Sequence, residues 1–297
     1  MALKLNAGPK LILVLLVIAG LYVGWRKLEN QLVYQPGKDV DLTPAKLSIP
    51  YETVMVRTPD GLDLQGWFVP GDGSAAVTNQ PTVLFFHDAG CTISGVLDQL
   101  RVFHDLRLNV LVFDYRGFGN SPGWPGEKGV GLDALAAYFY LIETRHVHPK
   151  QLLLYGEGLG AAVAIELATK VQAAGLITQA APTTLVDRIG HVHPRIPWIL
   201  VFGNQFDALT LIKKVNMPVL LIHSVDDQEV PFRHSERLIA AASDPKSLLR
   251  IHGAHPNALW QSADACREAI GKFVLQHTAG AGSGASAKSA EPARSSR

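Results

Sequence analysis

Six short apolar runs without polar alternation most constrain the fold of this chain. They cover residues 82–87, 110–115, 152–155, 176–179, 219–223 and 248–251. Continuous apolar runs are typical of parallel strands that are covered on both faces. Helical stretches separate them, at 96–106, 131–145, 159–171, 233–242 and 258–276. This alternation predicts an α/β domain with a doubly wound, mostly parallel sheet.

Two segments depart from that rhythm. Residues 52–58 and 62–69 are predicted to form a hairpin, because the turn residues Pro59-Asp60-Gly61 join two half-buried strands. Residues 187–214 interrupt the later strands, and we expect a small lid over about 183–214 at the carboxyl edge of the sheet. With 47% hydrophobic content, the chain can bury one large core, and residues 31–278 are predicted to form a single domain.

Both ends are predicted to lie outside the domain. Residues 1–30 hold an N-terminal tail and an apolar run, 11–25, with lysine or arginine on both sides. At about 1.5 Å per residue the run covers roughly 22 Å, so the basic side chains must snorkel for it to span a membrane. A single-pass anchor is favoured over a cleaved signal peptide because no clear A-x-A site follows the run. Residues 279–297 are small and polar, which predicts a disordered tail.

Charge and metal-ligand patterns exclude several classes of partner. The net charge is +1 and the basic residues are scattered, so we expect no nucleic-acid surface. The cysteines Cys91 and Cys266 have no metal or redox spacing, and the pairs His146/His148 and His191/His193 lack nearby cysteines or spaced carboxylates. We therefore expect no metal and no cofactor. The membrane is the expected partner, through the N-terminal helix. Basic residues on both sides of the run say little about orientation, and we expect the domain on the extracytoplasmic side.

A strand, a glycine turn and a helix start follow one another over residues 152–162. This order matches the nucleophile elbow G-x-S-x-G, in which a strained turn presents a serine oxygen above the sheet. Here the motif reads Gly156-Glu157-Gly158-Leu159-Gly160. Gly158 stands at the serine position and has no side chain, so the expected nucleophile is missing.

An acid and a histidine follow later strands in the order that a hydrolase requires. Asp227 comes after the run 219–223, and His255 comes after the run 248–251. The carboxyl ends of parallel strands share one edge of the sheet, which is where open α/β sheets place their sites. In a triad the carboxylate orients the imidazole and stabilises its charged form while the imidazole transfers the proton. Asp227 and His255 are therefore the predicted catalytic residues.

Motifs along most of the chain carry a family resemblance. They are Leu32-Val33-Tyr34-Gln35-Pro36, Thr58-Pro59-Asp60-Gly61 with Gly66-Trp67, Asp114-Tyr115-Arg116-Gly117-Phe118-Gly119-Asn120-Ser121, and the segments 227–231 and 253–255. From about Gln31 to His277 the chain resembles α/β hydrolases of the serine aminopeptidase S33-like group, especially the membrane-anchored Bem46-like branch. The resemblance implies an α/β-hydrolase fold and hydrolysis of a small ester, thioester or amide. It also implies an oxyanion hole formed by the main-chain N–H groups of Ala89 and Leu159.

The chain departs from the family at two places. One is Gly158; glycine relieves strain of about 1–3 kcal/mol at a positive-φ turn. The other is the loop after the first buried strand, which is H-G-N-A-G-like in the family and reads His87-Asp88-Ala89-Gly90 here. A carboxylate at Asp88 would oppose a developing oxyanion if it pointed into the hole. We expect Asp88 to point into solvent instead.

Several functions remain open from the sequence. The chain is interpreted as a pseudo-hydrolase, or as a non-serine catalyst in which the His255–Asp227 dyad activates water or removes a substrate proton. An inactive ligand- or partner-binding scaffold at a membrane is the alternative. Cys91 is a further candidate nucleophile, although buried cysteine is more often a small apolar residue. Glu157 is expected to leave the elbow in a different direction from position 158.

A dinucleotide site is the most distant alternative. The spacing Gly156-x-Gly158-x-x-Ala161 after a strand fits the phosphate-binding fingerprint. Three parallel-type strands precede this turn, whereas the fingerprint normally opens its sheet. The next strand ends Thr178-Gln179-Ala180, without the acid that would bind a ribose. These two features favour an elbow.

Overall fold

Eight strands form one sheet in the order β1-β2-β4-β3-β5-β6-β7-β8. The computed structural model describes residues 7–71, 80–195, 205–255 and 261–278. The strands are β1 (Glu52–Arg57), β2 (Asp63–Val69), β3 (Thr82–Phe86), β4 (Asn109–Phe113), β5 (Leu152–Glu157), β6 (Gly175–Gln179), β7 (Val219–Ser224) and β8 (Lys246–Ile251). Strands β3 to β8 are parallel, and the β1–β2 hairpin joins β4 in antiparallel orientation. The predicted doubly wound, mostly parallel sheet is therefore confirmed.

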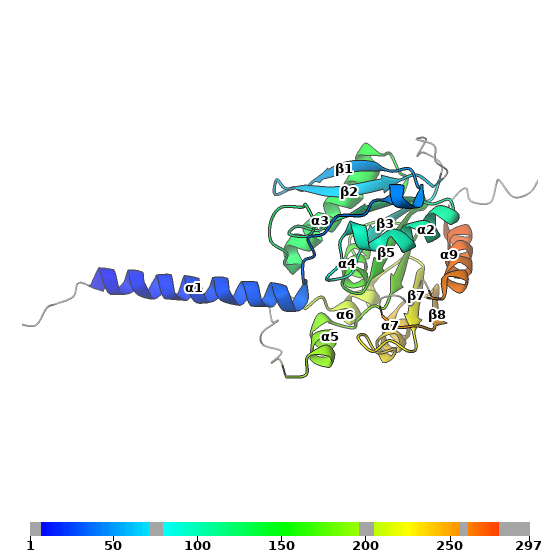
Figure 1. Cartoon of the computed structure of the whole chain (residues 1–297). Coiled ribbons are helices and arrows are strands. Elements are labelled where there is room, and N and C mark those ends of the chain that lie inside the picture. The colour runs from blue at the N-terminus through cyan, green and yellow to red at the C-terminus, as the bar shows by residue number, and fades with distance from the viewer. Residues whose placement is uncertain (1–6, 72–79, 196–204, 256–260, 279–297) are drawn as a thin grey trace, which may run out of the picture.

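Helices cover both faces of this sheet (Figure 1). The α-helices after β3 are α2 (Leu97–Asp105), α3 (Glu127–Phe139), α4 (Leu159–Ala168), α5 (Leu185–Val192), α6 (Ala208–Leu211), α7 (Arg233–Ala241) and α9 (Ala263–His277). Helix α5 lies away from the sheet, next to the end of the long N-terminal helix. Side chains of α3, α4, α6 and α7 share one core cluster with Leu84 and Phe86 of β3. Side chains of α2 and α9 share the other with Val83 and Phe85. Successive residues of a strand point to opposite faces, so one apolar run supplies both cores.

Several element boundaries differ from the sequence prediction by a few residues; α4, for example, ends at Ala168, before the predicted end at residue 171. Helix α3 begins at Glu127, before the predicted start at residue 131, and it ends in a π-helical turn, Tyr140–Thr144. The predicted lid contains α5 and α6, while residues 196–204 lie outside the described residues. The same holds for residues 279–297, where the disordered tail is predicted.

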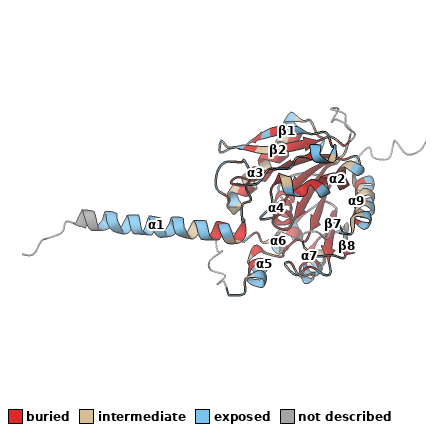
Figure 2. Ribbon diagram, in the orientation of Figure 1, coloured by how far each residue is buried: buried red, intermediate tan, exposed pale blue. Residues whose placement is uncertain are grey.

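One long helix, α1 (Ala7–Val33), projects from the domain (Figure 1). Most of its length is exposed, and only its last turns are buried against the domain (Figure 2). Its segment Leu11–Val33 has the length and composition needed to cross a membrane. The helix is longer than the apolar run because Arg26 pairs with Glu29 one turn away, and because Asn30 and Val33 are buried. It therefore continues past residue 30, the predicted end of the N-terminal segment.

The guanidinium of Arg116 ties the hairpin, the loop after β4 and α3 together. Its Nε donates to Asp133 Oδ1 at 2.9 Å, and its Nη1 donates to Asp60 Oδ2 at 2.7 Å. The side chain of Asp133 is fully buried, whereas that of Asp60 is 41% exposed. A buried charge left without its partner is far more costly than an exposed one.

We expect Arg116→Met to lower the free energy of unfolding by about 3–5 kcal/mol, because it leaves the Asp133 carboxylate buried and unpaired. Urea unfolding of the full chain in detergent measures the effect. Asp60→Asn is the matched control, and its cost is expected to stay below about 1 kcal/mol because the carboxylate is exposed. Equal costs for the two variants would contradict this assignment.

Candidate functional site

The turn between β5 and α4 has the backbone of a nucleophile elbow. Gly158 adopts φ +52° and ψ −112° and caps the first turn of α4. Its N–H donates to the carbonyl of Gln179 at 3.0 Å, which fixes the turn against the end of β6. Non-glycine residues rarely adopt such a φ, so the turn retains the strained geometry while the residue at its apex carries no side chain.

The carboxylate of Asp88 fills the space that a side chain at Gly158 would need. A Cβ built on Gly158 would overlap all three atoms of that carboxyl group. Asp88 Oδ1 accepts hydrogen bonds from the N–H of Ala89 at 2.7 Å and the N–H of Leu159 at 2.6 Å. These are the two donors predicted for the oxyanion hole. They come together as predicted, but Asp88 already occupies them.

The expectation that Asp88 points into solvent is therefore wrong. Asp88 is only 9% exposed to solvent. The reason is physical: Gly158 leaves an open space beside two main-chain donors at a helix N-terminus, and a carboxylate is well suited to both. The sequence places Asp88 and Leu159 71 residues apart, so their contact becomes visible only in the folded chain.

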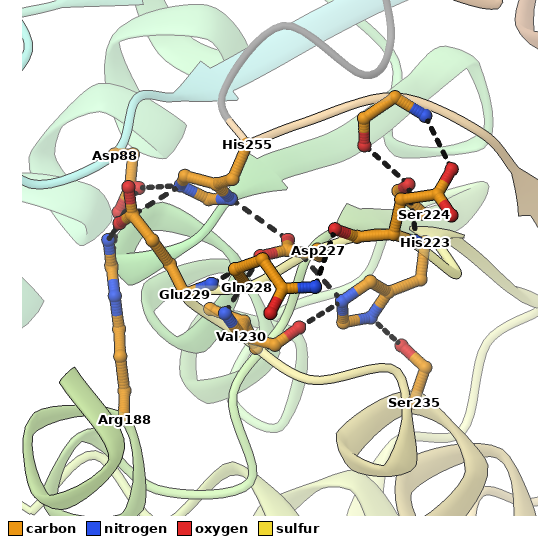
Figure 3. Close-up of polar contacts among 12 residues, drawn as sticks. Asp88, Arg188, His223, Ser224, Asp227, Gln228, Glu229, Val230, Ser235 and His255 are labelled. Atoms are coloured by element: carbon orange, nitrogen blue, oxygen red, sulfur yellow. Dashed lines mark hydrogen bonds and ion pairs between the residues drawn. The ribbon is translucent and has the colours of Figure 1, made fainter.

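Asp227 and His255 meet at the carboxyl edge of the sheet, as predicted (Figure 3). His255 Nδ1 lies 3.0 Å from Asp227 Oδ2. The N–H groups of Glu229 and Val230 donate to Asp227 Oδ1 at 2.9 and 2.8 Å, which fixes the carboxylate. On its other side, His255 Nε2 lies 3.2 Å from Asp88 Oδ2. The imidazole therefore bridges two carboxylates.

Arg188 of α5 completes the site, and the sequence analysis did not identify it. Its Nη1 donates to Asp88 Oδ1 at 2.7 Å and its Nη2 to Asp88 Oδ2 at 3.1 Å. The same Nη2 reaches Glu229 Oε2 at 3.3 Å (Figure 3). Arginine on a short amphipathic helix usually faces solvent, and the only pointer in the sequence was the position of Arg188 within the predicted lid.

These contacts shift the pKa values of the charged groups. Burial alone would raise the pKa of Asp88, but the charge of Arg188 and the hydrogen bond from His255 outweigh it and hold the pKa well below its usual range. Burial would lower the pKa of His255, but the hydrogen bonds to Asp227 and Asp88 dominate and raise it to about 10. At neutral pH the resting site thus holds an ionised Asp88 and a protonated His255. A protonated imidazole cannot accept a proton, so the His255–Asp227 dyad is not a general base in this state.

A cavity of about 360 Å³ opens above this cluster. Its polar lining includes Asp88, Arg188, Glu157 and His255, and its apolar lining includes Leu32, Val33, Leu185 and Ile189. The cavity therefore lies between the last turn of α1, helix α5 and the loop after β3. Its size and mixed lining suit a small ligand with an apolar part.

Two further titratable groups of the cavity, Cys91 and Glu157, are not activated nucleophiles. Burial and the nearby Glu157 raise the pKa of Cys91 to about 12, which keeps its thiol protonated. The side chain of Glu157 turns away from the elbow and accepts from the Tyr155 hydroxyl at 2.8 Å and from Gln99 Nε2 at 3.2 Å. Burial raises the pKa of Glu157 to about 7.

The site also bears on the dinucleotide and metal alternatives. A pyrophosphate at the N-terminus of α4 would meet the Asp88 carboxylate on the N–H of Leu159, so like charges would oppose it. Within the part of the chain that the structure describes, no group of three or more histidine, cysteine or acidic side chains could hold a metal ion. His193 lines the cavity, while His191 Nε2 lies 3.0 Å from the carbonyl of Gln228.

Comparison with known proteins places this fold and site in context. The chain matches no family model. It is 34% identical over 255 residues to Rv2307c of Mycobacterium tuberculosis, covering 86% of this chain and 89% of that protein. It is 31% identical over 243 residues to the protein bem46 of Schizosaccharomyces pombe, covering 77% and 78%. The alpha/beta hydrolase domain-containing protein WAV2 of Arabidopsis thaliana is 29% identical over 238 residues, covering 72% and 76%.

Solved structures show the same architecture. The esterase Pf2001 of Pyrococcus furiosus superposes with a TM-score of 0.69 at 20% identity, covering 82% of this chain and 98% of that one. At this identity the likeness supports the fold, and the site must be judged from its own residues.

The protonation of His255 is directly testable. We expect NMR of the ¹⁵N-labelled full chain in micelles to show an imidazolium at His255 at pH 8, because Asp88, Asp227 and, at 3.8 Å, Glu229 surround it while Arg188 lies beyond Asp88. The pKa rises from 6.5 to about 10 on folding. The resulting stability is fully present below pH 6.5 and is lost toward pH 10, by up to about 1.4 kcal/mol per pH unit.

Asp88→Asn is the informative variant for this titration. It removes one of the two carboxylates bonded to the imidazole, so the pKa of His255 should fall and the stability loss above pH 6.5 should shrink. A neutral His255 at pH 8 in the unaltered chain would contradict the ion cluster.

Proposed function

This chain belongs to the Bem46-like family of α/β hydrolases, and we propose that it is a member that does not use serine for hydrolysis. The observation that carries the proposal is that a glycine and a buried carboxylate stand at the elbow where a serine hydrolase has its serine and its free oxyanion hole. Gly158 has no side-chain oxygen, and the Asp88 carboxylate occupies both the vacant space and the two N–H donors of the hole. A serine hydrolase requires a nucleophile, a free oxyanion hole and a neutral histidine. The resting site offers none of the three.

We further propose that the protein works at a membrane surface. Helix α1 is long and apolar enough to span a bilayer, and its last turn lines the cavity through Leu32 and Val33. The cavity therefore opens beside the anchor, with apolar side chains of α5 on its other wall. This arrangement suits a small ester-, thioester- or amide-like ligand whose apolar part comes from the membrane. We propose that the domain lies on the extracytoplasmic side.

A ligand-binding scaffold is the second candidate function. The observation that favours it is the cavity of about 360 Å³ above a site whose charges are already paired. Such a site can hold a ligand without turning it over, because binding requires shape and charge complementarity but no free nucleophile.

The proposal that the protein does not use a serine nucleophile is tested with a fluorophosphonate probe, which labels activated serines. We expect no site-directed labelling of the unaltered chain. Gly158→Ser alone should also remain unlabelled, because its Cβ would overlap the Asp88 carboxylate, which hydrogen bonds from Ala89, Leu159 and Arg188 hold in place. The double variant Gly158→Ser with Asp88→Gly frees the space, exposes the N–H groups of Ala89 and Leu159, and removes one carboxylate from His255.

We expect that double variant to be labelled at least about 10²-fold faster than Gly158→Ser, since each oxyanion donor contributes about that factor. Asp88→Gly alone is the matched control and should stay unlabelled. Labelling of any serine of the unaltered chain, located by peptide mass spectrometry and lost in His255→Ala, would overturn the proposed function.

Membrane anchoring is tested by carbonate extraction of cell membranes. The unaltered chain should resist extraction and retain residues 1–25. Leu16→Arg with Val17→Arg places two charges in the middle of α1, at a cost of about 5–7 kcal/mol together, and should release the chain. Leu28→Arg lies near the basic end of the helix, where a charge can snorkel, and should remain bound.

Loss of residues 1–25 from the mature chain would show a cleaved signal instead. Protease protection in sealed vesicles then reports the side of the membrane on which the domain lies.

A further inference from the structure

The Asp88 carboxylate stands where a hydrolase needs its nucleophile, and its two oxygens have different surroundings. Oδ1 is held in the hole by the N–H groups of Ala89 and Leu159. Oδ2 faces the imidazole of His255, which Asp227 orients from the other side (Figure 3). This arrangement has the same functional order as a Ser-His-Asp triad. Asp88 takes the place of the serine, His255 lies beside its Oδ2, and Asp227 orients the histidine.

We propose that Asp88 is a carboxylate nucleophile that attacks a saturated carbon whose leaving group departs as an anion. This inference rests on one part of the proposed function, namely that Gly158 supplies no nucleophile. Carboxylates act as nucleophiles in their ionised form, and Arg188 with the two N–H donors keeps Asp88 ionised. Attack on an acyl carbon would give an anhydride more reactive than the substrate. Attack on a saturated carbon gives an ordinary ester.

The first step transfers the charge of Asp88 to the leaving group. An electron pair of Oδ2 forms the new O–C bond, and the electron pair of the breaking bond departs with the leaving anion. Arg188 pairs with both oxygens of Asp88 in the resting site. Once Asp88 becomes a neutral ester, Arg188 loses that partner and its charge stabilises the departing anion. The carbonyl oxygen of the ester, Oδ1, remains in the hole.

The second step regenerates the carboxylate with water. Alkylation removes one of the two carboxylates that hold the proton on His255, so the imidazole releases that proton to solvent. A water molecule then attacks Cγ of Asp88 while His255 Nε2 accepts its proton. The negative charge develops on Oδ1, where Ala89 and Leu159 donate to it.

Collapse of this intermediate expels the alkoxide, which takes the proton from His255. The free Asp88 acid then returns its proton to the imidazole. The net reaction converts an alkyl compound and water into an alcohol, the leaving anion and a proton, so atoms and charges balance without a further reactant.

The cavity fits such a substrate. Leu185 and Ile189 of α5 and Leu32 and Val33 of α1 form its apolar walls, and Asp88 and Arg188 lie at its charged end. A straight alkyl chain would contact the apolar walls while its terminal carbon faces Asp88.

The test uses the full chain in detergent with 1-bromoalkanes from ethyl to octyl. His255→Gln cannot accept a proton from water, so the alkyl ester should accumulate and raise the mass of the peptide that contains Asp88 by one alkyl group. In the unaltered chain, turnover in H₂¹⁸O should place ¹⁸O in the Asp88 carboxylate, because water attacks Cγ. Asp88→Asn should lose bromide release at least about 10²-fold. Asp264→Asn, a change at a 98% exposed carboxylate of α9 that does not line the cavity, should retain it.

The outcomes separate this inference from the proposed function. Absence of an Asp88 ester in folded His255→Gln across the series overturns the inference, as does ¹⁸O found only in the alcohol. Neither result affects the proposal that the protein does not use a serine nucleophile. That proposal would be overturned by fluorophosphonate labelling of the unaltered chain. Circular dichroism of each variant confirms that it is folded.

Discussion

The site depends on one steric exclusion: a side chain at position 158 and the carboxylate of Asp88 cannot occupy the same space. Gly158 permits the carboxylate to enter, and the N–H groups of Ala89 and Leu159 hold it there. The glycine at position 158 and the buried carboxylate at position 88 therefore depend on each other. Substitution at either position alone would leave an overlap or an empty, polar hole.

The charge states of the site follow from this steric exclusion. Once Asp88 is inside, His255 lies between two carboxylates and keeps its proton, and Arg188 balances the remaining charge. A neutral imidazole is the resting state that serine catalysis needs, whereas this site rests as paired ions. Removal of the charge on Asp88 takes away one of the two hydrogen-bonded carboxylates that raise the pKa of His255, and so favours the neutral form. The protonation of His255 is therefore coupled to the chemical state of Asp88.

The sequence predicted the fold well because its signals are local. Unbroken apolar runs identify strands buried on both faces, and parallel strands bring Asp227 and His255 to one edge whatever the details of the loops. The orientation of the Asp88 side chain, in contrast, is not determined by local sequence. It depends on a space that opens only when the loop after β3 packs against the elbow, so no local pattern contains it. Arg188 was missed for the same reason, since its partner lies 100 residues away.

Arg188 also links the charged site to α1, the helix that is long and apolar enough to cross a membrane. It lies on α5, whose neighbours Leu185 and Ile189 share the cavity with Leu32 and Val33 of α1. The cation that holds Asp88 ionised is therefore carried by a short helix beside α1, rather than by the sheet. The sheet fixes Asp227 and the elbow, whereas the charge balance at Asp88 depends on how α5 packs. A ligand that enters between α1 and α5 would contact the apolar walls of the cavity and the guanidinium at the same time, so binding and charge balance are physically coupled.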